Sequence, residues 1–156
     1  MGKYYGLVKP EHAVDFVTAV VDVLGGGENA CSLMLETAMT ETHLGALMDP
    51  TRKGAGTGLC QNDELPFYDT IRRTRAKHQE AVLEAFNIEV MDIKWEELEN
   101  SPLLSFIACR LVYKLVPESI PDTIEGRAAY WKKYYNTSAG KGTVEKYIEN
   151  AKKLYE

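Results

Sequence analysis

The sequence predicts a mostly α-helical protein of the α+β class, with a small lobe of turns or a short β-hairpin after its second helix. Apolar residues recur at helical spacing in several segments, and proline, glycine and capping residues mark where these segments begin and end. Glycine and polar residues instead concentrate between residues 47 and 63. The chain of 156 residues is 45% apolar and 26% charged, which is sufficient for one hydrophobic core. We therefore expect a single domain over residues 1–156.

Two helices are predicted in the first third of the chain, over residues 10–24 and 29–44. Pro10 suits a first helical turn, and the apolar residues after it share one face: Ala13, Phe16, Val17, Val20, Val21 and Leu24. The three glycines at 25–27 end this helix. A phosphate-binding loop would require Gly-Lys-Ser/Thr after them, which the sequence lacks, so we expect a plain connection. Gly45 is the predicted stop of the second helix.

Helical patterns resume after the glycine-rich segment. Residues 64–87 are predicted to be helical in pieces, of which 76–86 is the clearest. Residues 101–117 indicate a central buried helix, because apolar residues surround most of it, Ser101 can cap it and prolines mark its two ends. A helix over 122–136 begins with an Asp122-x-x-Glu125 capping pattern, and Thr143 is the predicted cap of the last helix.

Charge and cysteine content argue against several classes of protein. The net charge is −5, and the one modest basic cluster comprises Arg72, Arg73, Arg75 and Lys77. We interpret this cluster as a solvated helix face, so nucleic acid is not an expected partner. The cysteines are Cys31, Cys60 and Cys109. Their odd number and wide spacing indicate free thiols in a reducing compartment, with neither a zinc site nor a disulfide framework.

No targeting or membrane segment is apparent in the sequence. The first twelve residues lack an apolar signal core, and no run of about 18 apolar residues occurs. We therefore expect no stable insertion into a membrane. We also expect synthesis in the cytoplasm without a Sec-type export signal.

Two glutamates of the second predicted helix differ in helical phase. The apolar stripe of this helix consists of Ala30, Leu33, Met34, Thr37 and Ala38. At about 100° per residue, Glu41 lies near the middle of this stripe, whereas Glu36 lies roughly 120–140° from its centre. The pattern therefore predicts a solvated Glu36 and a Glu41 directed toward the core.

A carboxylate on the core side of a helix C-terminus has two interpretations. In the predicted position, burial and the negative end of the helix dipole would both disfavour the charged form of Glu41, and a carboxyl group kept protonated near neutral pH can act as a general acid. Alternatively, Glu41 is structural and pairs with a buried arginine, for which Arg110 is the candidate. The glycine-rich segment that follows favours a ligand site, in which Gln61 and Asp63 would share one face of an extended strand. An ordinary hairpin is the alternative there.

The segments "TETHLG" and "GAGTGLCQND", between residues 40 and 63, resemble the group of goose-type lysozymes and lytic transglycosylases. In that group a helix ends in Glu-Ser or Glu-Thr, and a Gly-Leu-Met/Phe-Gln strand follows. Glu41-Thr42 and Gly58-Leu59-Cys60-Gln61 match these motifs. Two later segments, "SPLLSFIACRLVYKLVPESIP" and "AAYWKKYYNTSAGKGTVEKYI", are similar to lysozyme-like proteins of tailed phages and prophages. The resemblance extends over residues 29–155.

The resemblance implies a lysozyme-like fold and assigns roles by position. Glu41 would be the catalytic acid, and Asp63 matches an aspartate that follows the Gln in goose-type lysozymes. The residues expected to bind substrate are Thr42, His43, Gly58, Leu59, Gln61, Tyr135 and Asn136. Cys60 replaces the usual Met or Phe, a tolerable exchange of one soft apolar residue for another. The loop from 47 to 57 is peculiar to this chain, so Asp49 has no aligned role.

The implied substrate is the glycan strand of peptidoglycan, cleaved at the β-1,4 bond between MurNAc and GlcNAc without cofactor or metal. Glu41 would protonate the glycosidic oxygen. If Asp63, or with less support Asp49, positions a water, the outcome is hydrolysis. If no second carboxylate is in reach, the N-acetyl and 6-hydroxyl groups of the substrate complete the reaction and an anhydro-sugar results. The sequence leaves both outcomes open.

Two rival functions follow from the same residues. A lysozyme-like fold can persist as a catalytically inactive structural or wall-binding part of a phage tail, with other virion proteins as partners. A metal-dependent hydrolase would use His12, His43 and His78, whose spacing matches no metal motif. In the absence of an export signal, a wall-degrading enzyme would reach its substrate after holin-type release or as a virion component.

Aromatic residues have mostly structural interpretations. The run in the 122–136 helix comprises Tyr130, Trp131, Tyr134 and Tyr135. A sugar-stacking platform is one interpretation, but the spacing equally suits a core stripe, and we expect most of the run in the core and Tyr135 in the cleft. Trp95 is predicted to pack in the core, and "SAGKG", residues 138–142, to form a turn.

Overall fold

The computed structural model describes residues 4–48, 56–136 and 140–156. These residues form seven α-helices: α1 (His12–Leu24), α2 (Gly27–Thr42), α3 (Glu64–Arg73), α4 (Ala76–Phe86), α5 (Pro102–Lys114), α6 (Ile124–Trp131) and α7 (Val144–Leu154). Three shorter segments are η1 (Val90–Asp92), η2 (Trp95–Leu98) and the π-helical η3 (Lys132–Asn136). The prediction of a mostly α-helical protein is confirmed. Within the described residues, β structure is limited to one antiparallel bridge between Thr57 and Asn62, and the predicted hairpin also covers residues 49–55, outside them.

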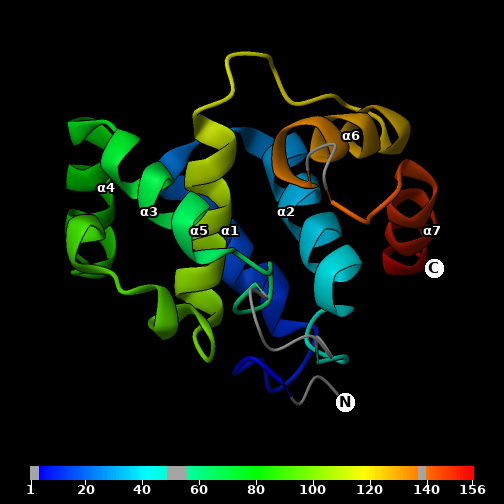
Figure 1. Ribbon diagram of the computed structural model, residues 1–156, viewed down its shortest axis with the longest axis horizontal. Helices are drawn as coiled ribbons and strands as arrows, with labels where there is room; N and C mark the ends of the chain where they lie inside the picture. Colours follow the sequence, from blue (N-terminus) through cyan, green and yellow to red (C-terminus); the bar gives the residue numbers. More distant parts are fainter. Residues whose placement is uncertain (1–3, 49–55, 137–139) are drawn as a thin grey trace.

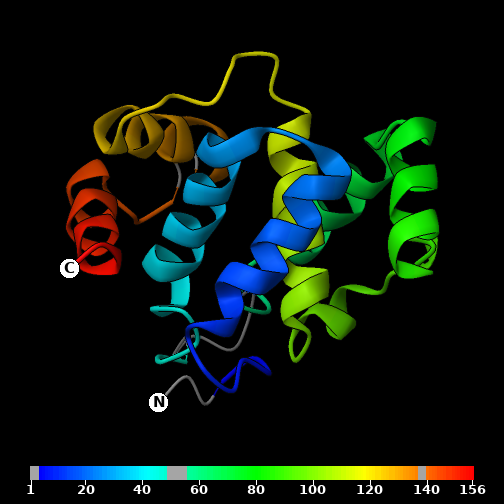
Figure 2. The same cartoon turned by 180° about the vertical axis from the view of Figure 1, so that it is seen from behind.

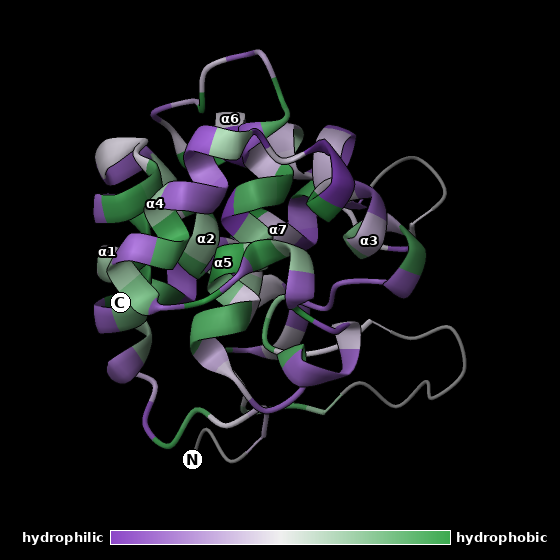
Figure 3. Ribbon diagram, turned by 90° about the vertical axis from the view of Figure 1, so that its left-hand side faces the viewer, coloured by the Kyte–Doolittle hydropathy of each residue, from purple (hydrophilic) through white to green (hydrophobic). Residues whose placement is uncertain are grey.

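Helix α5 lies between the two sides of the molecule. Helices α3 and α4 lie on one side of it and α2, α6 and α7 on the other, while α1 crosses behind it (Figures 1 and 2). α5 packs against α1, α2 and α3. The turns of α5 are among the most apolar of the view in Figure 3, and polar residues colour much of the outer helices. The predicted buried helix over 101–117 is therefore confirmed, with bounds of Pro102 and Lys114.

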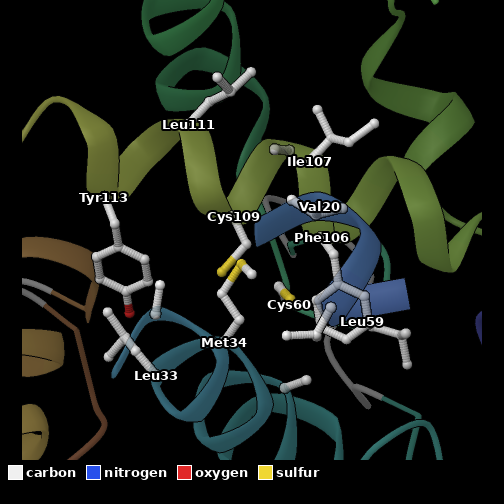
Figure 4. Close-up of a cluster of buried hydrophobic side chains, with 14 of the residues drawn as sticks. Val20, Leu33, Met34, Leu59, Cys60, Phe106, Ile107, Cys109, Leu111 and Tyr113 are labelled. Carbon is white, nitrogen blue, oxygen red and sulfur yellow. The ribbon is translucent and has the colours of Figure 1, made fainter. Parts of the chain in front are cut away.

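The core joins α5 to α2 and to the short turn at residues 57–62. Figure 4 shows side chains of α5 directed toward α2, with the turn residues beside them. The labelled core residues at this junction are Leu33, Met34, Leu59, Cys60, Phe106, Cys109 and Tyr113, all buried. The cysteines are free thiols, as predicted, and burial raises the pKa of Cys60 well above its usual range. The turn that follows α2 is thus part of the core.

Helix boundaries follow local capping chemistry. The hydroxyl of Ser101 accepts a hydrogen bond from the Leu104 amide at 3.1 Å, as predicted, and Thr143 accepts from Lys146 at 3.1 Å. The predicted Asp122 cap is wrong, because Thr123 directly precedes the first helical residue and its hydroxyl accepts from the Gly126 amide at 3.0 Å.

The end of α2 also differs from the prediction. The left-handed residue that caps this helix is His43, with φ of 50°, so α2 ends at Thr42 and not beside Gly45. Leu44 and Gly45 also have positive φ values, 52° and 80°. The chain therefore turns sharply within three residues, and α2 stops one residue after Glu41.

Glu36 is the buried glutamate of α2, and the prediction that it is solvated is wrong. Its side chain is 0% exposed, and both of its oxygens accept hydrogen bonds from Arg127 at 2.8 Å. The helical wheel identified only the face of α2 that packs against α1 and α5. Helices α6 and α7 cover the neighbouring face, which carries Glu36. A helix covered from two sides has more than one buried stripe.

Candidate functional site

Glu41 lies at the C-terminal end of α2 and is half-buried. Its Oε2 atom accepts a hydrogen bond from the Trp131 indole Nε1 at 3.2 Å. Trp131 belongs to α6 and is buried, so this contact ties the carboxylate to an element about 90 positions away in sequence. The predicted alternative partner, Arg110, instead donates from Nε to the Gly25 carbonyl at 2.9 Å.

Thr42 holds the end of α2 against the turn at 57–62. Its hydroxyl donates to the Leu59 carbonyl at 2.8 Å and accepts from the Gly45 amide at 3.1 Å. Thr42 is 0% exposed, so these hydrogen bonds are shielded from water. Its observed role is therefore to fix the position of Glu41 relative to the turn.

Residues 57–62 form a tight turn rather than the extended strand that the glycines predicted. Gly58 and Gln61 have φ values of 76° and 52°. The side-chain Nε2 of Gln61 donates to the Gly58 carbonyl at 2.8 Å. The buried Oε1 of the same side chain has no hydrogen-bond partner among the described residues. Because the backbone reverses here, Gln61 and Asp63 do not share one face of a strand. Asp63 is exposed and lies at the N-cap position of α3.

The small residue at 58 is required by packing. A Cβ atom on Gly58 would lie 2.3 Å from the Ser105 hydroxyl and 2.5 Å from the Leu98 carbonyl. Leu59 is fully buried in the core. Gly58 and Leu59 therefore face η2, α5 and the core, and their role as substrate contacts stays a prediction.

Tyr135 joins the turn to the segment that follows α6. Its hydroxyl donates to the Cys60 carbonyl at 2.6 Å, and its ring stacks on Tyr113 with centroids 5.3 Å apart. Burial raises the pKa of Tyr135 well above its usual range, and the nearby charges, Glu41 among them, act in the same direction. Tyr135 and Asn136 belong to η3, and π-helical segments of this kind occur frequently at functional sites.

Two cavities share Asn136 as a lining residue. The first, of about 350 Å³, is lined by Glu41, His43, Trp131 and residues of α7. The second, of about 450 Å³, is lined by Gln61, Asp63, Tyr135 and residues of α3 and α5. Asn136 lines both, and its Oδ1 accepts from the Lys132 ammonium at 2.8 Å. Of the predicted site residues, Glu41, His43, Gln61, Asp63, Tyr135 and Asn136 therefore line these two cavities, whereas Thr42, Gly58 and Leu59 line neither.

Charged residues of α7 complete the first cavity, and sequence analysis did not identify them. Lys146, Glu149 and Lys153 line it together with His43. Burial lowers the pKa of His43, Lys153 and Lys146 lower it further, and Glu149 opposes them. No motif marks these three residues, because an exposed helix face with alternating charge has the same pattern.

The other predictions have mixed outcomes. Tyr130 and Trp131 are buried, as predicted for most of the aromatic run. Trp95 packs against the core while half-buried, and its indole donates to the Asn62 carbonyl at 2.7 Å, so it also supports the turn. Asp49 and residues 138–139 of the predicted 138–142 turn lie outside the described residues.

Comparisons with known proteins give no further assignment. No protein-family model, curated protein or solved structure matches this chain. Among the described residues, no group of three or more histidine, cysteine or acidic side chains could hold a metal ion. The helices of this same part of the chain are too short or too polar to cross a membrane.

Proposed function

We propose that this protein is a peptidoglycan-degrading glycosidase, a muramidase or lytic transglycosylase with a lysozyme-like fold, in which Glu41 is the general acid. The observation that carries the proposal is the position of Glu41. It lies one residue before the end of α2, is half-buried, and lines a cavity that shares Asn136 with a second cavity. A general acid needs such partial shielding together with access for substrate.

Glu41 would donate its proton to the glycosidic oxygen between MurNAc and GlcNAc as that bond breaks. Trp131 supports this role by hydrogen-bonding one carboxyl oxygen, which fixes the direction of the other. Thr42 and Tyr135 support it by anchoring the turn at Leu59 and Cys60. Preorganised groups of this kind reduce the cost of reaching the reactive geometry.

The second half of the reaction depends on whether another carboxylate reaches the bond. Asp63 lines the cavity that shares Asn136 with the cavity of Glu41, which supports hydrolysis through a water. Without such a carboxylate, the 6-hydroxyl of the substrate would close an anhydro-ring. Mass spectrometry of the digested wall distinguishes these outcomes, because hydrolysis leaves reducing ends and transglycosylation leaves anhydro-ends.

The substitution Glu41→Gln tests the enzymatic proposal. It keeps the size of the side chain and removes the proton donor, so release of soluble muropeptides should fall by at least about 100-fold. Glu145→Gln is the matched control, because Glu145 is exposed and lies outside both cavities. Equal release by wild-type and Glu41→Gln proteins would refute the role of Glu41.

Absence of any release by the wild-type protein, with retained sedimentation on purified walls, would favour the inactive wall-binding alternative. The proposal implies action at the bacterial cell wall, reached after holin-type release or as a virion component.

A further inference from the structure

A third cavity, lined largely by polar groups, lies at the opposite end of α2 from Glu41. It has a volume of about 360 Å³ and is bounded by the start of α2, the end of α5, the loop over residues 115–123 and Tyr130 of α6. Figure 1 shows this loop passing above the first turn of α2. Gly26 and Glu41 are about 22 Å apart along the helix at 1.5 Å per residue, so this cavity lies far from Glu41, although it shares the lining residue Val116 with the cavity of Asp63.

Arg110 in this cavity is buried without an acidic partner. The residue is 5% exposed, and its Nε donates to the Gly25 carbonyl at 2.9 Å. The ion pairs among the described residues involve Arg72, Arg73, Arg127 and Lys153, and none includes Arg110. Within the same residues, the Gly25 contact is also the one hydrogen bond that its guanidinium forms. A buried cation without a counter-ion is costly.

The Arg110 side chain lies between two helix ends of opposite polarity. Its Nε faces the carbonyl end of α1, which carries partial negative charge and offsets part of the burial cost. Its Nη2 faces the start of α2, since a Cβ added to Gly26 would lie 2.6 Å from it. That helix end carries partial positive charge and has no side-chain cap, and its first turn also carries the exposed Glu28. The Nε edge of the guanidinium therefore faces partial negative charge, whereas the Nη2 edge faces partial positive charge.

A second cationic side chain lines the cavity. Lys114, one turn after Arg110, also lines it. Burial lowers the pKa of Lys114, and the positive charges of Arg110, Lys77 and Arg75 lower it further. The basic residues that precede and begin α4 thus contribute to one positive region together with Arg110. Glu118 lies at the rim of the cavity, where its carboxylate accepts a hydrogen bond from the Tyr134 hydroxyl.

We propose that this cavity binds a phosphate-class oxyanion, held by the Arg110 guanidinium, the Lys114 ammonium and the amides of the first turn of α2. The planar guanidinium can bond two oxygens of one tetrahedral anion, and the ammonium adds a point charge. The backbone amides at the start of a helix can donate hydrogen bonds to an anion without help from side chains. Two cationic side chains and a helix end balance a doubly charged phosphate better than a singly charged carboxylate. This inference does not depend on the glycosidase proposal.

Titration with inorganic phosphate at constant ionic strength tests the site. Calorimetry should detect binding to the wild-type protein, and the melting temperature should rise with phosphate relative to chloride. Lys114→Gln should weaken phosphate binding by roughly threefold to tenfold, and Arg110→Lys, which loses the fork, by roughly tenfold. Lys152→Gln is the matched control, because it removes the same charge from an exposed position of α7.

Several results would overturn the proposal. Wild-type protein that gives no heat with phosphate, or Lys114→Gln protein that binds like wild type, excludes the site. General stabilisation by phosphate as a salt would appear equally in wild-type and Lys114→Gln proteins. Acetate that binds as tightly as phosphate would exclude the phosphate class. If the Arg110→Lys protein does not fold, comparison of phosphate binding by the Lys114→Gln and Lys152→Gln proteins tests the site by itself.

Discussion

Glu36 and Arg127 form a bidentate ion pair in which Nε and Nη2 of the arginine each lie 2.8 Å from a carboxylate oxygen. The side chains are 0% and 7% exposed. The hydroxyls of Tyr147 and Tyr155 donate to the same two oxygens at 2.8 and 2.6 Å. One buried carboxylate therefore joins α2, α6 and α7, the three helices that surround the Glu41 cavity. The network therefore links the helices that form the walls of that cavity.

Substitution of either member of the ion pair should strongly destabilise the protein. Glu36→Gln leaves the Arg127 charge buried without its counter-ion, so we expect a loss of about 3–5 kcal/mol in the free energy of unfolding, measured by urea denaturation. Asp69→Asn disrupts the exposed contacts to Arg72 and Arg73 and should cost less than about 0.5 kcal/mol. Similar costs for the two variants would contradict this account.

Tyr155 should make the protein less stable in strong alkali. Burial and the hydrogen bond to Glu36 raise its pKa to about 12, from an ordinary value of 10.0. Between these pH values the unfolded chain loses the proton while the folded protein keeps it. The contribution of Tyr155 to the free energy of unfolding is therefore complete below pH 10 and is lost as the pH rises toward 12. Urea denaturation at a series of pH values measures this slope, and Tyr155→Phe should reduce it, whereas exposed Tyr4→Phe should not.

His43 should titrate below its ordinary pKa of 6.5. Burial is the main cause, and Lys153 and Lys146 add to it against the opposing charge of Glu149. Because the folded protein binds this proton less readily than the unfolded chain, the contribution to stability is complete above pH 6.5 and declines as pH falls. NMR titration of the imidazole measures the pKa. Lys153→Gln should raise it, Lys152→Gln should leave it unchanged, and a wild-type value above 6.5 would contradict the placement of His43.

Thr42 should affect both stability and any activity of Glu41. Thr42→Val removes the donor to Leu59 and the acceptor for Gly45, so the buried backbone groups lose their partners at a cost of about 1–3 kcal/mol. Thr42→Ser keeps both hydrogen bonds and should restore most of the loss. Exposed Thr18→Val is a control for the loss of a hydroxyl on a helix. If Thr42→Val is as stable as wild type, the hydrogen bonds of Thr42 do not hold the turn in place.

Local sequence determined most of the helices. Periodicity and caps located α1, α5 and α7 because these signals act within a few residues, as in the Ser101 and Thr143 caps. The same local information placed Glu41 near the end of a helix, but it set that end beside Gly45, three residues beyond Thr42, and predicted an extended strand where a tight turn forms. The misplaced cap of α6 shows the limit of this approach, since Asp122 and Thr123 are both good capping residues and one position separates them.

Tertiary structure decided which charged side chains are buried and which groups they contact. Glu36 is buried because α6 and α7 return to cover a second face of α2, with Arg127 and Tyr147 at positions 91 and 111 residues away. Arg110 faces the start of α2 for the same reason, since α1 and α2 bring their ends to α5. The sequence by itself determined where helices form, because propensity and capping are local. Only packing between distant segments decided which carboxylate is enclosed and which faces a cavity.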